Sequence, residues 1–217
     1  MFCFLCNTCY NGLFKMNFMD EVWLIVLWSI FGLLHSLLAA NKIKDYAISL
    51  GMTRNSIRLT YNAISVLSLV PIVLYHINYE GTLLFEPFAY QAFIGYLFGI
   101  AAFLILYFAF RKYDLLEFLG FGKWNIENTL NVSGINKVVR HPLYTGTIAG
   151  TLGLWFFRPD SAMTISAICI FIYLLIGTYF EERKLILKFG EAYVAYKKSV
   201  PRFFPKPGDL YKLIVKD

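Results

Sequence analysis

Five long apolar segments, joined by polar connections, constrain the fold of this chain more than any other feature. They comprise residues 22–40, 57–77, 91–110, 142–157 and 161–180, so each holds 16 to 21 residues. A helix of about 20 apolar residues crosses the roughly 30 Å hydrocarbon core of a bilayer. With 58% hydrophobic and only 16% charged residues, the 217-residue chain is too apolar for a water-soluble domain. We therefore predict an all-α fold, with residues 1–217 forming a single polytopic membrane helix bundle of about five transmembrane helices.

The basic residues predict the orientation of that bundle. Eighteen of the 20 Lys and Arg residues lie in or beside the first and third connections and in the tail, whereas only Lys15 and Arg158 lie on the other side. Because cytoplasmic loops collect basic residues, we expect the amino terminus outside and the carboxyl terminus in the cytoplasm, so that an active site formed by polar residues of the last third of the chain would also be cytoplasmic. This favours a multi-pass protein of a bacterial inner membrane, in contact with membrane lipids. The formal charge of +6 is spread between apolar runs, which argues against nucleic acid as a partner.

The amino-terminal residues carry a weak metal-binding pattern. Cys3, Cys6 and Cys9 have the spacing of thiolate ligands, but no fourth ligand lies near them in the sequence. We therefore predict no metal site. Met16 and Met19 directly precede the first good apolar run, so residues 1–19 are interpreted as a dispensable leader.

Most polar residues of chemical interest lie in the last third of the chain. Pro142 suits the first turn of a helix and favours an extended conformation at His141. Arg140 and His141 would then stand at the positive end of that helix, where free backbone N–H groups bind a carboxylate or phosphate. Glu181 and Glu182 follow the fifth apolar segment on the same side of the membrane. Together these side chains predict a receptor for a zwitterion, with Arg140 and His141 for its carboxylate and a glutamate for its ammonium group.

The sequence after residue 180 predicts a C-terminal amphipathic cytoplasmic helix. Its apolar face follows a 3.6-residue repeat and contains Glu182, Leu185, Phe189, Tyr193 and Tyr196. We expect this helix to lie on the membrane or against the bundle.

Several residues inside the apolar segments have two interpretations. His35 and Ser36 either line a substrate cavity or hydrogen-bond to a neighbouring helix. Tyr61 either anchors its helix at the interface or borders the site. Gly146 and Gly150 form a G-x-x-x-G pattern that allows close approach of another helix or of a ligand.

Two segments within residues 132–206 resemble a known family. They are RHPLYTG, residues 140–146, and EERKLILKFGEAYVAYKKSVPRFFP, residues 181–205. Both resemble the C-terminal motif of the isoprenylcysteine carboxyl methyltransferase superfamily of membrane enzymes, which includes phospholipid methyltransferases, methanethiol S-methyltransferases and NnrU-like proteins. The resemblance implies S-adenosylmethionine as cofactor, a cofactor-binding module over residues 132–206, and Arg202 near the substrate end. The residues that it implies around the cofactor are His141, Leu143, Tyr144, Glu181, Glu182, Tyr193 and Tyr196.

The zwitterionic methionine part of S-adenosylmethionine agrees with the charge pattern. We predict in-line transfer of a methyl group to a thiol or carboxylate of a lipophilic or small acceptor, with Arg140, Arg202 and Glu182 as catalytic residues. An arginine would favour ionisation of an acceptor thiol, whereas a carboxylate needs no base. Two alternatives are a non-catalytic NnrU-like accessory protein and a sterol-reductase-like NADPH oxidoreductase, which carries a related RHPxY element. The pattern identifies neither the acceptor nor the oligomeric state.

Overall fold

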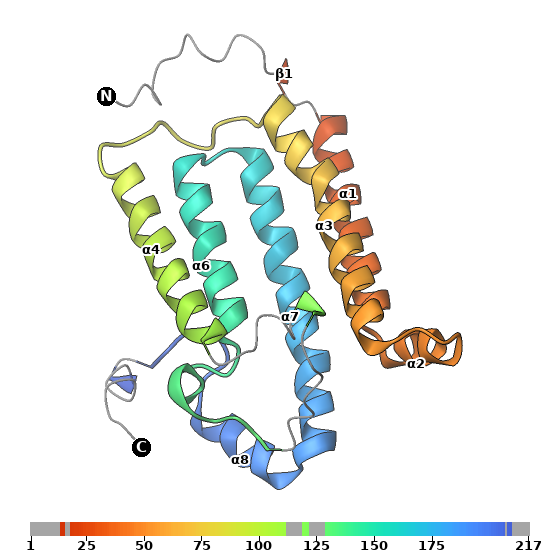
Figure 1. Ribbon diagram of the computed structural model, residues 1–217. Coiled ribbons are helices and arrows are strands. Elements are labelled where there is room, and N and C mark those ends of the chain that lie inside the picture. Colours follow the sequence, from red (N-terminus) through yellow and green to blue (C-terminus); the bar gives the residue numbers. More distant parts are fainter. Residues whose placement is uncertain (1–13, 16–17, 112–118, 122–128, 207, 210–217) are drawn as a thin grey trace.

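The computed structural model describes residues 14–15, 18–111, 119–121, 129–206 and 208–209. Its helical elements are α1 (Phe18–Ala39), α2 (Asn41–Ser49), α3 (Arg54–Asn78), α4 (Gln91–Phe110), the 3₁₀ turn η1 (Gly134–Lys137), α6 (Pro142–Phe157), α7 (Ser161–Phe189) and α8 (Glu191–Ser199). Within the described ranges, the named strands are the parallel pair β1 (Phe14–Lys15) and β2 (Tyr79–Glu80), of two residues each. The prediction of an all-α membrane bundle is therefore confirmed (Figure 1).

Four helices in the described part of the chain are long and apolar enough to cross a membrane. They are α1, α3, α4 and α7, and they cover four of the five predicted segments. The remaining segment forms α6, which has 16 residues and runs alongside α4 and α7 (Figure 1). The outward faces are apolar, since Leu33, Leu67 and Phe103 are 64%, 67% and 68% exposed. Such faces favour lipid over water, as expected for an integral membrane protein.

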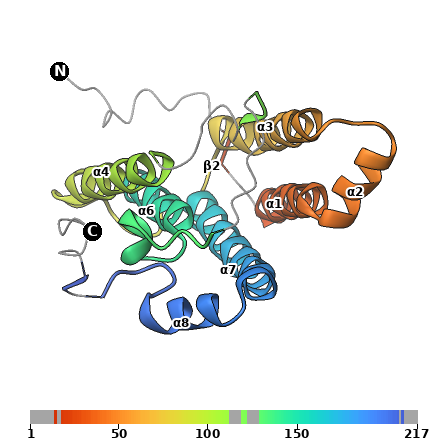
Figure 2. The same cartoon turned by 60° about the horizontal axis from the view of Figure 1, so that its bottom comes forward.

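Helix α7 lies between two helix pairs, α1 with α3 and α4 with α6 (Figure 2). The α4–α6 pair is packed through glycine, because a Cβ on Gly153 would lie 3.1 Å from the carbonyl oxygen of Gly95. A Cβ on Gly146 would lie 2.7 Å from the side chain of Leu106, and one on Gly150 would face α4 as well. The close approach at Gly146 and Gly150 is therefore that of a helix.

The loop between α6 and α7 is tied to the end of α3. Arg158 pairs with Asp160 and donates to the carbonyl oxygens of His76 and Tyr79, at 2.8 and 2.7 Å. Asp160 also caps α7 by accepting a hydrogen bond from the backbone N–H of Met163, at 2.8 Å. These contacts fix the two helix pairs relative to each other at the end of the bundle opposite α2 and α8 (Figure 1).

Helix α7 continues past its apolar segment, which corrects one predicted boundary. The pattern predicts a new helix from Glu181, but α7 runs unbroken through Glu181 and Glu182 to Phe189. At 1.5 Å per residue α7 is about 43 Å long, more than the ~30 Å apolar core, so its last turns extend beyond that core. The chain then turns at Gly190, whose φ of +57° suits glycine. Tyr193 and Tyr196 consequently lie on a separate helix, α8.

Candidate active site

The start of α6 is bound to the segment that follows α8. The backbone N–H of Arg140 donates to the carbonyl oxygen of Pro201 at 2.9 Å, and that of His141 donates to the carbonyl oxygen of Arg202 at 3.2 Å. These bonds bring the two ends of the predicted cofactor module together. They also occupy the N–H groups of Arg140 and His141, so the predicted anion site does not have these two donors free.

Glu182 is the centre of a buried ion-pair network. The residue is 2% exposed, and its Oε1 accepts from Nε and Nη2 of Arg140 at 3.2 and 2.7 Å. Its Oε2 lies 2.7 Å from Nζ of Lys197 and 3.4 Å from Nη2 of Arg202. A buried carboxylate without partners costs several kcal/mol, so these cations stabilise the ionised Glu182 side chain.

This network bears on the roles predicted for Arg140, Arg202 and Glu182. The sequence pattern assigns Arg140 to the carboxylate of a bound zwitterion and Glu181 or Glu182 to its ammonium group, but in the structure Arg140 and Glu182 bind each other. Arg140 has a side chain that is only 7% exposed. The observed geometry therefore gives the three residues a structural role, and their catalytic role stays a prediction.

His141 lies between the two glutamates. Its Nε2 is 3.3 Å from Oε1 of Glu182, and its Nδ1 is 3.6 Å from Oε2 of Glu181. The imidazole ring also stacks on Tyr144, with ring centroids 5.6 Å apart and an interplanar angle of 11°. His141 thereby links the buried network to Glu181, whose side chain is 45% exposed.

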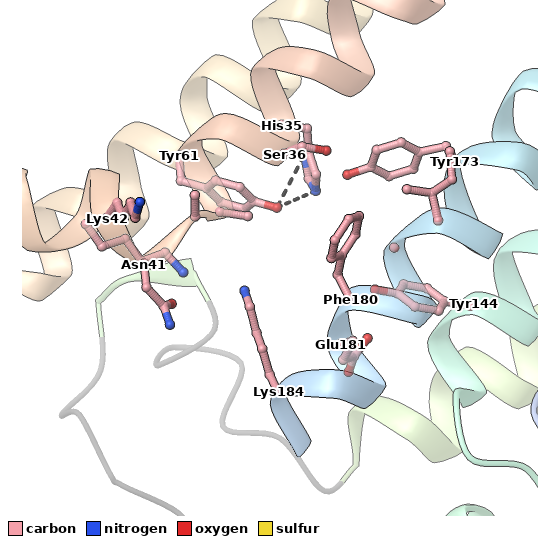
Figure 3. A pocket seen from close by; sticks show the side chains of 15 residues that line it. His35, Ser36, Asn41, Lys42, Tyr61, Tyr144, Tyr173, Phe180, Glu181 and Lys184 are labelled. Carbon is pink, nitrogen blue, oxygen red and sulfur yellow. Dashed lines mark hydrogen bonds between the residues drawn. The ribbon is translucent and has the colours of Figure 1, made fainter. Parts of the chain in front are cut away.

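A cavity of about 600 Å³ lies beside Glu181 and is lined by residues of α1, α2, α3, α6 and α7 (Figure 3). Its polar and aromatic lining comprises His35, Ser36, Asn41, Lys42, Lys44, Tyr61, Tyr144, Tyr173, Phe180, Glu181 and Lys184. A smaller hollow of about 90 Å³ is lined by Arg140, His141, Pro142, Leu143, Tyr144 and Glu181. Because Tyr144 and Glu181 line both spaces, the two adjoin each other.

Aromatic side chains from three helices surround the cavity: Tyr61 of α3, Tyr144 of α6 and Tyr173 of α7 (Figure 3). The Tyr61 hydroxyl makes a short hydrogen bond with Nε2 of His35, and Oγ of Ser65 is 3.0 Å from Nδ1 of the same ring. The His35 ring also contacts the rings of Tyr61 and Tyr173, at centroid distances of 4.8 and 5.7 Å. His35 therefore both lines the cavity and hydrogen-bonds to a neighbouring helix.

Charged groups gather at the α2 end of this cavity. Glu181 and Lys184 are three residues apart on α7, so they share a helix face. Lys42 and Lys44 come from α2. Burial lowers the pKa of Lys44, and the positive charges of Lys184 and Arg58 lower it further. The cavity thus presents one carboxylate and several ammonium groups to a ligand.

Tyr193 and Tyr196 pack in a separate cluster with Val200. The Tyr196 hydroxyl donates to the carbonyl oxygen of Asn136 at 2.7 Å. Neither tyrosine lines the cavity of Figure 3 or the smaller hollow. The structure therefore places these two predicted cofactor residues near the Glu182 network, away from the cavity lining.

Sequence reasoning missed several cavity residues, among them Tyr173, Lys184 and the lysines of α2. A signal was present in α7, because Tyr173, Gly177, Glu181 and Lys184 follow one another at spacings of four, four and three residues, as on one helix face. The polar stretch that forms α2 carries no comparable signal.

Metal ligands do not cluster in the described part of the chain. No group of three or more His, Cys, Asp or Glu side chains there could hold a metal ion. Cys3, Cys6 and Cys9 lie outside the described residues.

The fold and the site define a class of protein: a membrane helix bundle in which a buried ion-pair network adjoins a polar cavity. The chain belongs to the NnrU protein family, which it matches over residues 23–203. The predicted resemblance to the isoprenylcysteine carboxyl methyltransferase-like membrane proteins and their NnrU-like branch is thereby confirmed.

Two kinds of curated relative are similar to this chain. The chain is 33% identical over 82 residues to methanethiol S-methyltransferase of Pseudomonas deceptionensis, covering 37% of this chain and 30% of that protein. It is 38% identical over 74 residues to methanethiol S-methyltransferase 2 of Bradyrhizobium diazoefficiens, covering 32% of this chain and 26% of that protein. It is 25% identical over 181 residues to the chloroplastic 15-cis-zeta-carotene isomerase of Zea mays, covering 82% of this chain and 48% of that protein.

The chain spans less than half the length of each of these relatives. No solved structure matches it significantly. The relatives support a membrane methyltransferase-like family.

Proposed function

We propose that this protein is an S-adenosylmethionine-dependent membrane methyltransferase. The observation that supports this most is the cavity of Figure 3, where Glu181 and Lys184 lie on one face of α7 and tyrosines line the walls. The methionine part of the cofactor carries an ammonium and a carboxylate, which require one acidic and one basic partner. The similarity to methanethiol S-methyltransferases supports the same conclusion.

The residues of the cavity suit this cofactor in charge and chemistry, and its volume suits the cofactor in size. Glu181 would bind the ammonium group, and Lys184 together with Lys42 would bind the carboxylate. The faces of Tyr61 and Tyr144 would attract the sulfonium, since aromatic rings attract cations by about 0.5–2 kcal/mol. A volume of about 600 Å³ lies within the usual range for small-molecule sites. This assignment keeps Glu181, one of the two predicted glutamates, for the ammonium group and replaces Arg140 and His141 by Lys184 and Lys42 for the carboxylate.

When bound, the cofactor supplies a methyl group on a positively charged sulfur that departs as a neutral thioether. The protein's own contribution is alignment and exclusion of water, which together account for a large share of many rate enhancements. Glu182 holds His141, and His141 in turn faces Glu181 at 3.6 Å. The buried network would thus orient the carboxylate that binds the cofactor.

Titration of the purified protein in detergent with S-adenosylmethionine by calorimetry tests this proposal. Glu181→Gln and Lys184→Met should each weaken binding by about 10- to 100-fold, because each removes a charge-assisted hydrogen bond of roughly 1.5–3 kcal/mol. Glu191→Gln and Lys198→Met make the same changes on exposed residues of α8 and should leave binding unchanged. Absence of binding by the wild-type protein would contradict the proposal and favour the non-catalytic accessory alternative.

We further propose that the cavity end of the bundle faces the cytoplasm of a bacterial inner membrane. The support is the excess of basic residues at that end. In a variant whose native cysteines are replaced by serine, Glu86→Cys, at an exposed position of the connection before α4, should react with an impermeant maleimide added to intact spheroplasts. Lys198→Cys should react only after lysis. The opposite pattern would reverse the orientation.

A second candidate function is isomerisation of a double bond in a long apolar substrate. It is supported by the carotene isomerase relative, which covers more of this chain than the methyltransferase relatives do. Incubation of membranes with 15-cis-zeta-carotene, followed by chromatography of the isomers, tests it.

The oxidoreductase alternative requires NADPH binding. Titration of the purified protein with NADPH, in the same calorimetric experiment as S-adenosylmethionine, tests it.

A further inference from the structure

His35 is held in the wall of the cavity by two side chains of α3. The Tyr61 hydroxyl binds Nε2, and Oγ of Ser65 lies 3.0 Å from Nδ1. Tyr61 and Ser65 are four residues apart, so they share the helix face that meets α1. His35 and Tyr61 both line the cavity, and their side chains point toward each other (Figure 3). The pair therefore forms part of the cavity surface.

Other titratable groups that face this pair are poorly suited to accept a proton. Glu181 faces His141, Lys44 and Lys184 are cations, and Tyr144 and Tyr173 are phenols that keep their protons at neutral pH. Imidazole is the side chain that takes up and releases protons near neutral pH. Among the described residues that line the cavity, His35 is the one imidazole.

We propose that His35 and Tyr61 form the general base for a thiol acceptor; this inference rests on the proposed function. The thiol sulfur forms a bond to the methyl carbon, while the bond from that carbon to the sulfonium sulfur breaks and its electron pair stays on the departing sulfur. The thiol proton passes to the Tyr61 oxygen as the Tyr61 proton passes to Nε2 of His35. Nδ1–H of His35 donates to Ser65, which orients the ring for this transfer. His35 ends as imidazolium and afterwards releases the proton to water.

The charges around the cavity support a thiol as the acceptor. Lys44, which the cofactor carboxylate does not use, stabilises the negative charge that develops on sulfur when its proton leaves. A carboxylate acceptor is already ionised at neutral pH and has no use for a base. Methylation of an amine would create a cationic product among the lysines of the cavity, which disfavours an amine as the acceptor. The substrate class that fits the cavity is therefore a thiol that is neutral in water.

A comparison of two thiols tests the proposal. Hexanethiol is neutral at pH 7, whereas 4-nitrothiophenol is already ionised and needs no base. His35→Gln should lower kcat for hexanethiol by about 10²–10⁴-fold, the usual contribution of a general base, and should leave kcat for 4-nitrothiophenol unchanged. Tyr61→Phe should likewise lower kcat for hexanethiol and not for 4-nitrothiophenol. This second variant keeps the test decisive if His35→Gln does not fold. In the wild type the rate with hexanethiol should rise and then level off near neutral pH, whereas in both variants it should keep rising toward the pKa of the thiol, because only free thiolate then reacts.

His76→Gln is the matched control, because His76 bonds to Ser166 at 2.9 Å and does not line the cavity. It should leave both rates unchanged. The general-base proposal is wrong if both variants bind S-adenosylmethionine normally but lower kcat equally for the two thiols. It is also wrong if both variants bind the cofactor and leave kcat unchanged for both thiols. If the wild-type protein binds no S-adenosylmethionine, it is the proposed function that fails.

Discussion

Arg140 and Glu182 lie 42 residues apart in the chain, yet Nε and Nη2 of Arg140 are 3.2 and 2.7 Å from one oxygen of Glu182. This contact joins the start of α6 to α7 beyond its apolar segment. Lys197 and Arg202 reach the other oxygen, so α8 and the segment after it meet at the same carboxylate. The ion pair thus holds together the elements that position His141 and Glu181.

Glu182→Gln should destabilise the protein strongly. The substitution leaves Arg140, which is almost fully buried, without its anionic partner, and breaking a buried ion pair on one side costs about 3–5 kcal/mol. Thermal unfolding in detergent, followed by circular dichroism, should show a clear fall in Tm. Glu191→Gln, on the exposed side of α8, should leave Tm unchanged. Equal Tm values for the two variants would contradict the structural role of the network.

Gly190→Ala should destabilise the junction between α7 and α8. Gly190 has a φ of +57°, and an added Cβ would meet nothing within 4 Å, so the cost is purely conformational. Strained backbone of this kind costs about 1–3 kcal/mol. Gly99→Ala is the matched control, because Gly99 lies inside α4, has open space around it, and should gain about 0.5–1 kcal/mol. Opposite shifts in Tm are therefore expected for the two variants.

Tyr193 should make the fold sensitive to alkaline pH. Burial raises the pKa of Tyr193 to about 12, and the charge of Glu182 acts in the same direction. The unfolded chain loses this proton near pH 10.0, so the free energy of unfolding should fall as pH rises from about 10 to 12. Tyr193→Phe should remove that part of the pH dependence in chemical unfolding curves. An unchanged curve would contradict the assignment.

Tyr193 and Tyr196 should differ in how much their hydroxyl groups contribute to stability at neutral pH. The Tyr193 hydroxyl lies beside Arg140 but has no partner at hydrogen-bond geometry in the described part of the chain. Tyr193→Phe should therefore cost little. Tyr196→Phe removes the bond to the Asn136 carbonyl and should cost about 1 kcal/mol. The free energies of unfolding of the two variants check this difference.

The helices of the bundle were predictable because their apolar runs are long. Hydropathy locates α1, α3, α4, α6 and α7, but it places the end of the fifth segment at Phe180, where the apolar run ends. The helix itself continues to Phe189, because no residue before Gly190 interrupts it. Helix α2 has nine residues and a mixed composition, so hydropathy does not detect it.

The gathering of four ionisable residues at one end of the bundle was predictable, but their pairing and several residues of the cavity lining were not. Charge pattern and family resemblance correctly gather Arg140, His141, Glu181 and Glu182 at one end of the bundle. They do not reveal that Arg140 turns toward Glu182, because that choice depends on the packing of α8 and Lys197 against α7. Lys184 could be recognised as a cavity residue only from the fold, because the sequence does not show which face of α7 borders the cavity.

Alanine substitutions at three glycines of α6 should show how closely α6 packs on α4. A Cβ on Gly153 would meet backbone atoms of Gly95 and Gly99 at 3.1 Å, which cannot move without separating the helices. A Cβ on Gly150 would meet Ala102 at 3.6 Å, which is ordinary contact. Gly153→Ala should therefore destabilise the bundle by about 1–3 kcal/mol, the usual cost of overpacking. Gly150→Ala should be neutral or stabilising, because it also removes the entropic cost of glycine in a helix. At Gly146, the side chain of Leu106 at 2.7 Å must shift, so Gly146→Ala should fall between the two in Tm.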